Sequence, residues 1–157
     1  MTHIRTLWLA GAAALLLAAP AHAQRQVNAR EDASATGTVE IEMNSGSVRV
    51  TGWSRNEVQV TGNLSRSDDR VDVERGGRRV EVRVANRRGG RGGPANLEIR
   101  VPAGSVLSVT AGSAPITISG ITGSVEAVGQ SGPVTVQAAN ARRVEVVAQS
   151  GPVTIEG

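Results

Sequence analysis

β-branched residues alternate with polar residues in short runs along most of the chain, and small residues separate these runs. In residues 143–156, Val144 and Val146 alternate with polar neighbours, and Val153 and Ile155 do the same after a corner of Gln, Ser, Gly and Pro. A period of two that is interrupted by such corners is typical of a strand, a turn and a second strand. No helical period occurs after residue 23, so the pattern predicts an all-β protein.

The same pattern recurs at a nearly fixed interval. Residues 124–137 match residues 143–156 at an offset of 19 positions, and the corner of a looser copy at 111–118 lies 18 positions upstream of the equivalent corner. Residues 38–50 repeat the pattern near the start of the chain. Two strands and two corners in each repeat match one coil of a β-solenoid, in which equivalent residues stack about 4.8 Å apart. We therefore predict a single-stranded β-solenoid (β-helix) with about 18–19 residues per coil over residues 38–157.

The alternation also predicts which side chains face the interior. Val134 and Val136 should point inward and lie beneath Val153 and Ile155, with the intervening threonines outward, because the side-chain period of a strand is two. After Thr154, no proline, lysine or inward-facing charge blunts the last coil. We expect either that the native protein continues or that the coil stacks on another molecule, with Val153 and Ile155 forming a self-association edge.

The first 23 residues have the features of an export signal. Arg5 supplies a positive charge, residues 7–19 form an apolar stretch, and residues 21–23 form an Ala-x-Ala cleavage site. The apolar stretch is too short for a membrane span, and the absence of cysteine excludes a bacterial lipid anchor and a disulfide framework. We predict a signal peptide at 1–23, a periplasmic or secreted protein without a transmembrane anchor, and a flexible lead-in at 24–37.

The predicted mature chain lacks most of the residues that carry enzyme chemistry. Removing 23 of the 157 residues leaves 134, and these contain no His, Cys, Lys, Tyr or Phe. Ser–His–Asp and Cys–His catalytic groups are excluded, as are imidazole and thiolate metal sites, so we expect no cofactor and no enzyme activity. Paired carboxylates can hydrolyse glycosides, but Glu126 and Glu145 are predicted to stack on a solvent-facing strand without a cleft. The net charge of 16 arginines minus 14 acids, or +2, is too small to indicate a partner.

Seven arginines fall within residues 75–91, and a Gly/Arg-rich loop spans residues 86–94. Behind an export signal we do not expect nucleic acid, so the guanidinium groups would bind the phosphate or carboxylate groups of anionic envelope polymers or lipids. The candidate anion-binding residues are Arg75, Arg78, Arg79, Arg87, Arg88 and Arg91. The alternative interpretation is a flexible, solubilising loop whose charges protect a sheet edge.

Two further features have both a structural and a functional interpretation. Trp53, the only aromatic residue after residue 23, is expected to cap the core, and carbohydrate stacking is the alternative. The acidic run at 68–74 is expected to form a solvent-exposed strand face, and a calcium site is the alternative because carboxylates suit that ion.

Three short motifs carry a resemblance to a known family. Residues 46–53 read Gly-Ser-Val-Arg-Val-Thr-Gly-Trp, residues 101–104 read Val-Pro-Ala-Gly, and the corners that begin at Ser131 and Ser150 read Ser-Gly-Pro-Val-Thr. Together with the export signal, they resemble the largely uncharacterised β-strand-repeat family of bacterial adhesin-like proteins over residues 38–157. The resemblance implies a repeating β-solenoid similar to the heads of some autotransporter adhesins and to bactofilins. It supplies no active-site residues.

These observations together predict an exported, non-catalytic structural or adhesin-like protein of the bacterial envelope. The alternative is a module that binds an anionic glycan or lipid through the arginine-rich loop. The expected partners are a second copy of the chain, through its open C-terminal coil, and anionic envelope polymers.

Overall fold

The computed structural model describes residues 24–157, which form twelve strands and no helix. The strands are β1 (Arg25–Asp32), β2 (Thr38–Trp53), β3 (Glu57–Leu64), β4 (Asp69–Gly76), β5 (Arg79–Asn86), β6 (Ala95–Pro102), β7 (Val106–Ser113), β8 (Ile116–Ser119), β9 (Ser124–Gly129), β10 (Val134–Gln137), β11 (Arg143–Ala148) and β12 (Val153–Glu156). The all-β prediction is confirmed. Within these residues, no helix has the length and apolar character needed to cross a membrane. The predicted signal peptide at 1–23 lies outside the described residues.

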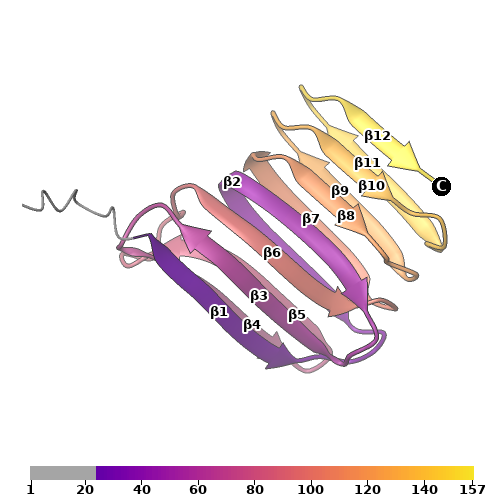
Figure 1. Ribbon diagram of the computed structural model, residues 1–157, viewed down its shortest axis with the longest axis horizontal. Coiled ribbons are helices and arrows are strands. Elements are labelled where there is room, and N and C mark those ends of the chain that lie inside the picture. Colours follow the sequence, from indigo (N-terminus) through magenta and orange to yellow (C-terminus); the bar gives the residue numbers. More distant parts are fainter. Residues whose placement is uncertain (1–23) are drawn as a thin grey trace, which may run out of the picture.

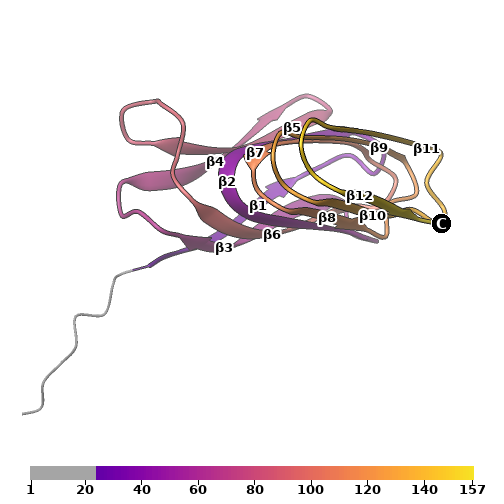
Figure 2. The same cartoon turned by 90° about the horizontal axis from the view of Figure 1, so that it is seen from above.

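The strands form two layers that face each other (Figures 1 and 2). Layer A contains β1, β3, β6, the second half of β2, β8, β10 and β12, in that order. Layer B contains β4, β5, the first half of β2, β7, β9 and β11. β2 crosses between the layers at Gly46, whose φ is 109° and where a Cβ would overlap the carbonyl oxygen of Ala95. Glycine is therefore required at this crossing.

From β7 onward, successive strands alternate between the layers, and equivalent strands of neighbouring coils pair in parallel. In layer A, Val134 pairs with Ile116 on one side and with Val153 on the other. The predicted stacking of Val134 on Val153 is confirmed. In layer B, β9 pairs with β7 and β11 in the same parallel manner.

A single regular solenoid does not extend over residues 38–157, because the N-terminal part of the sheet is mixed. β3 pairs antiparallel with β6 and β1, and β4 pairs antiparallel with β5 through a turn in which Gly77 has a φ of 64°. Strands β5 and β6 form a coil parallel to β2, but on the opposite side of β2 from β7 and β8 (Figure 1). The order of coils in space therefore differs from their order in sequence.

The segment expected to be a flexible lead-in instead contains β1, so that expectation is wrong. β1 pairs with β3 over its whole length, from Arg25 opposite Leu64 to Asp32 opposite Glu57. Its two apolar side chains, Val27 and Ala29, pack against the core. Only two small apolar residues mark this strand in the sequence, and its order comes from pairing with a distant strand.

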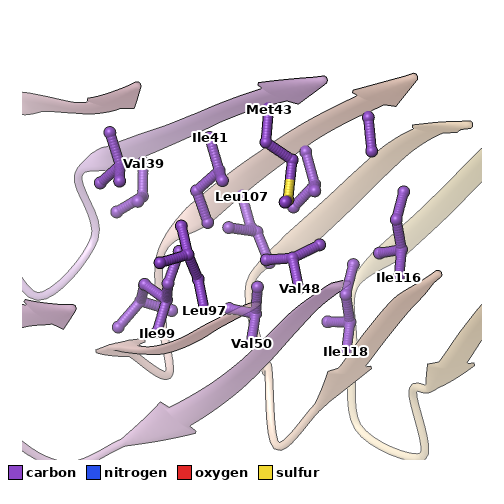
Figure 3. Packing of buried hydrophobic residues seen from close by; sticks show 14 of the residues in the cluster. Val39, Ile41, Met43, Val48, Val50, Leu97, Ile99, Leu107, Ile116 and Ile118 are labelled. Atoms are coloured by element: carbon purple, nitrogen blue, oxygen red, sulfur yellow. The ribbon is translucent and has the colours of Figure 1, made fainter. Parts of the chain in front are cut away.

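The core fills the space between the layers and runs along the stack of coils. Figure 3 shows the packing of this core, where Val39 and Ile41 from layer B face Val48 and Val50 from layer A. All four side chains are buried. The period of two within each strand places these residues inward and their polar neighbours outward.

Candidate functional site

The six predicted anion-binding arginines lie at opposite ends of β5. The turn group, beside the β4–β5 turn, comprises Arg75, Arg78 and Arg79. The loop group, after the end of β5, comprises Arg87, Arg88 and Arg91. β5 has 8 residues, so about 23 Å of extended strand separates the two groups at about 3.3 Å per residue. The arginines that are neighbours in the sequence thus do not form one site.

The turn group makes contacts with its own protein surface. Arg79 pairs with Glu40 at 3.1 Å, and Arg78 donates a hydrogen bond to the Thr36 hydroxyl at 2.8 Å. Arg75 Nε donates to the carbonyl oxygen of Gly77 at 3.3 Å. Exposed contacts of this kind contribute little to stability, and they engage one nitrogen of each of the three guanidinium groups.

Residues 87–94, which we call the arginine loop, have a defined shape. The side chain of Asn86 accepts hydrogen bonds from the backbone N–H groups of Arg88 at 3.0 Å and Gly90 at 2.9 Å. Its amide nitrogen donates to the carbonyl oxygen of Arg91 at 3.4 Å. The N–H of Gly92 donates to the carbonyl oxygen of Val84 at 3.1 Å. These bonds fold the loop over the end of β5 and argue against the flexible-loop alternative.

A buried carboxylate holds the far end of the arginine loop. Asp69 is fully buried, and its Oδ2 accepts a hydrogen bond from the N–H of Gly93 at 2.8 Å. A Cβ at Gly93 would lie 2.9 Å from that oxygen and 2.8 Å from the side chain of Arg66, so a larger residue would push the loop off its anchor. The expectation of a solvent-exposed acidic strand is wrong for Asp69, because it begins β4 facing inward beneath the loop.

The arginine loop borders a pocket of about 340 Å³. The pocket lies between this loop, the layer B ends of β2 and β7, and the corner that follows β9. Its polar side chains are those of Glu42, Asn44, Arg83, Arg91, Thr110 and Gln130. Of the loop group, Arg91 therefore lines a concave site, whereas Arg87 and Arg88 are exposed outside its lining.

The two arginines of the pocket differ in their availability. Arg83 Nε donates to Glu42 at 3.1 Å, and Arg83 also pairs with Glu81. The hydrogen bond to Glu42 and the negative charge of Glu81 raise the pKa of Arg83, so its charge is fixed and already compensated. Arg91 forms no ion pair within residues 24–157. It is the charge in the pocket that an incoming anion can use.

Three residues at equivalent positions of neighbouring strands line the pocket. Asn44, Gly112 and Gln130 follow paired residues of three neighbouring strands, and all three line the pocket. A Cβ at Gly112 would lie 2.6 Å from the carbonyl oxygen of Asn44, so this position cannot carry a side chain without a shift of the backbone. Asn44 therefore packs directly against Gly112, and the amides of Asn44 and Gln130 lie on either side of a residue that adds no side chain to the pocket. Sequence reasoning missed both residues, and their place at equivalent repeat corners was the signal that could have identified them.

The predicted self-association edge lies at the end of the stack opposite β1 and β4 (Figure 1). Val153 is 44% exposed and Ile155 is 54% exposed, although the equivalent Val134 and Val136 are completely buried. In the same coil, Val147 of β11 is 48% exposed and faces outward, in register with Val128. Within residues 24–157, the inward-facing apolar side chains of β12 are thus left uncovered.

Trp53 does not cap the core as expected. It is partly buried outside the core, and its ring lies near the guanidinium groups of Arg55 and Arg100, at 5.2 and 5.7 Å from the ring centre. Its indole N–H donates to the carbonyl oxygen of Glu57 at 2.9 Å. These contacts are cation–π interactions that occupy the ring.

A second hollow, larger and shallower than the pocket beside the arginine loop, has a volume of about 760 Å³ and crosses layer A. It lies beside Arg49 and Glu98, which pair with each other at 3.9 Å.

The carboxylates are spread over the surface. Glu126 and Glu145 are adjacent in register on exposed positions of β9 and β11, as predicted. Residues 24–157 contain no group of three or more acidic residues placed to hold a metal ion. The calcium alternative for residues 68–74 therefore has no support in the described part of the chain.

Comparisons with known proteins give a consistent set of names at low similarity. No family model and no curated protein matches the sequence. Among solved structures, a putative cell adhesion protein from Clostridium sporogenes has 9% identity and a TM-score of 0.47, over 84% of this chain and 99% of the other. A putative adhesin from Parabacteroides merdae has 11% identity and a TM-score of 0.47, over 83% of this chain and 56% of the other.

A third structural neighbour, a putative adhesin from Bacteroides fragilis, has 8% identity and a TM-score of 0.31, over 84% of this chain and 96% of the other. The names of these neighbours agree with the family that the sequence resembles. At such identities and TM-scores, the likeness carries no argument about what this chain binds. The function must be argued from the pocket itself.

Proposed function

We propose that the protein is an exported, non-catalytic, adhesin-like protein that binds an anionic glycan in the pocket beside the arginine loop. The observation that carries the proposal is Arg91, which lines a concave site without an ion pair to any of residues 24–157. A guanidinium group binds a carboxylate through two parallel hydrogen bonds. Arg87 and Arg88, on the same loop, add positive charge that attracts an anionic polymer.

The surroundings of Arg91 favour a glycan over a lipid. The side-chain amides of Asn44 and Gln130 and the hydroxyl of Thr110 also line the pocket, and these groups donate and accept hydrogen bonds as sugar hydroxyls require. A lipid head group would also need an apolar surface for its acyl chains. The large exposed apolar side chains nearest the C-terminal end, such as Val153 and Ile155, belong to strands that do not line this pocket.

The pocket is better suited to binding than to catalysis. Its one carboxylate, Glu42, is held in an ion pair with Arg83 at 3.1 Å, and acid–base hydrolysis of a glycoside needs two carboxylates with separate roles. Residues 24–157 also contain no His, Cys, Lys or Tyr.

Export is part of the proposal, and it requires cleavage after Ala23. The intact mass of the protein from the cell envelope should correspond to a chain that begins at Gln24, and retention of Met1 would contradict export by this signal.

The proposal is tested by titrating the protein with an acidic oligosaccharide, an oligogalacturonate, and with a neutral oligosaccharide of equal length. We expect binding of the acidic probe alone, with an affinity that falls as salt is added, because added ions screen the charges. Replacing Arg87, Arg88 and Arg91 together with Ser should abolish binding without a large change in the melting temperature, since these side chains are exposed. Unchanged binding by this variant would contradict the proposal. Binding of anionic vesicles, without binding of the oligosaccharide, would show that the ligand is a lipid and not a glycan.

The exposed last coil supports a second role, in self-association. We propose that two copies pair through their C-terminal coils, with Val153 and Ile155 of one chain against those of the other. A twofold contact of this kind places apolar side chains on apolar side chains. Stacking one molecule head to tail is less favourable, because the opposite edge strands, β1 and β4, carry charged residues such as Arg30, Asp72 and Glu74.

Sedimentation equilibrium of the exported protein over a range of concentrations tests this second role. A monomer–dimer equilibrium is expected, and replacing Val153 and Ile155 with Lys should shift it to the monomer. Thr154→Lys is the matched control, because Thr154 lies in the same strand and its side chain points to the opposite side. A strict monomer at the highest concentration, or equal effects of the two changes, would contradict pairing through this coil.

A further inference from the structure

We infer that the glycan lies along the corners of successive coils, with its acidic group at Arg91 and its following sugars on a ladder of amide and hydroxyl side chains. This inference rests on the function proposed above and deepens it. It identifies the ligand as a polysaccharide that contains an acidic sugar. It also gives the direction in which the polysaccharide runs across the protein.

The ladder consists of the turns that connect layer B to layer A. In four coils, equivalent positions at the layer B corner form two ranks, which we call the amide rank and the serine rank; glycine replaces the amide in one coil. The amide rank is Asn44, Gly112, Gln130 and Gln149, and the serine rank is Ser45, Ser113, Ser131 and Ser150. Ser45 is half-buried, and the other three serines, like Gln130 and Gln149, are exposed. The polar groups thus form a double row, interrupted in the amide rank at Gly112, and the amide rank begins inside the pocket.

Backbone hydrogen bonds fix the spacing of the ladder. The N–H of Gln130 donates to the carbonyl oxygen of Ala111 at 3.2 Å, and the N–H of Ser131 donates to that of Gly112 at 3.0 Å. In the next coil, the N–H of Gln149 donates to the carbonyl oxygen of Gly129 at 3.0 Å. Neighbouring strands lie about 4.8 Å apart, so equivalent side chains recur at that interval. One sugar ring of an extended polysaccharide covers a similar length, which allows one hydrogen-bonding contact from each coil to each sugar.

The pocket sets the position of the acidic sugar. Position 112 carries no side chain, lies in register between Asn44 and Gln130, and lines the pocket together with both of them. A sugar ring placed in the pocket over this position can bring its carboxylate toward Arg91, which lines the same pocket. The sugars that follow would lie over Gln130 and Gln149. The strands of the pocket therefore determine both where the acidic sugar binds and where the rest of the glycan leaves the pocket.

Chain-length dependence tests the inference. Galacturonic acid and its di-, tri- and tetrasaccharides are titrated into the protein at constant salt, and we expect the affinity per molecule to rise with each added sugar up to the trisaccharide, whose three sugars lie over Gly112, Gln130 and Gln149. One additional hydrogen bond contributes about 0.5–1.5 kcal/mol, which is about a two- to tenfold change in affinity. The double variant Gln149→Ala with Ser150→Ala, which lies beyond the pocket lining, should lower the affinity for the tetrasaccharide and leave that for the monosaccharide unchanged.

Thr154→Ala is the matched control, because it removes a hydroxyl from the same coil but from strand β12 and not from the corner. It should change neither affinity. Equal affinity for the mono- and tetrasaccharide would overturn the inference and leave the proposed function intact. An equal loss in the control and the double variant would overturn it as well. Absence of binding for every acidic probe would overturn the proposed function itself.

Discussion

The last two coils have almost the same sequence and very different environments. Val134 and Val136 of β10 are completely buried, whereas Val153 and Ile155 of β12 are 44% and 54% exposed. The two strands pair in register, residue by residue. The difference arises because β10 has a neighbouring strand on both sides, and β12 has one on a single side within the described chain. The repeat sequence therefore determines which way a side chain faces, and the neighbouring coil determines how much its burial contributes to stability.

The largest expected difference between the two coils is the loss in the free energy of unfolding when a charged residue replaces an inward-facing valine. Val134→Asp should lower the free energy of unfolding by several kcal/mol, about 4, because a carboxylate would be buried without a partner. Val153→Asp, at the equivalent position, should cost less than about 1 kcal/mol, because its side chain can reach solvent. Urea unfolding of both variants measures the two values. Similar large costs would mean that the last coil is covered in solution, as pairing of two copies at the measured concentration would produce.

A smaller difference is expected in layer B from the loss of apolar contacts. Val125 is buried, and its neighbour in register, Val144, is only partly buried. Val125→Ala should destabilise the protein by about 2 kcal/mol, through lost transfer energy and a small cavity, and Val144→Ala by about 1 kcal/mol or less. The same unfolding experiment, performed at a concentration where the protein is monomeric, distinguishes them. A larger cost at Val144 would show that the terminal coil is the better packed of the two.

The smallest difference is expected for the outward-facing threonines. Thr135 is half-buried and Thr154 is exposed, and both point away from the core. Replacing either with Asp should change the free energy of unfolding by less than about 1 kcal/mol. If Thr135→Asp were as destabilising as Val134→Asp, the assigned facing of β10 would be wrong.

The parts of the fold that could be predicted from the sequence are those built from near-identical repeats. The pairing of Val134 with Val153 followed from the offset of the two copies, because parallel coils place equivalent residues side by side. The position of the β5–β6 coil did not follow, since its insertion beside β2 depends on competition between distant strands. β1 was missed for the same reason.

The candidate site was predicted only in part. The Gly/Arg-rich loop was identified, but the separation of the turn arginines from the loop arginines depends on the length and direction of β5. The anchoring role of Asp69 could not be read from an acidic run, because a single inward position in a short strand has no signature in the local sequence. Asn44 and Gln130 become part of a site only when the arginine loop folds beside them.

The central claim is that the charge of Arg91, and not the general positive charge of the surface, holds an acidic glycan. Isothermal titration of oligogalacturonate into Arg91→Gln and Arg142→Gln tests it directly, because both variants lose one exposed arginine and only Arg91 lines the pocket. A charged hydrogen-bonded contact contributes about 1.5–3 kcal/mol. Arg91→Gln should therefore weaken binding at least about tenfold, with Arg142→Gln close to the unmodified protein. Equal losses in the two variants would show that the binding is non-specific and would contradict the claim.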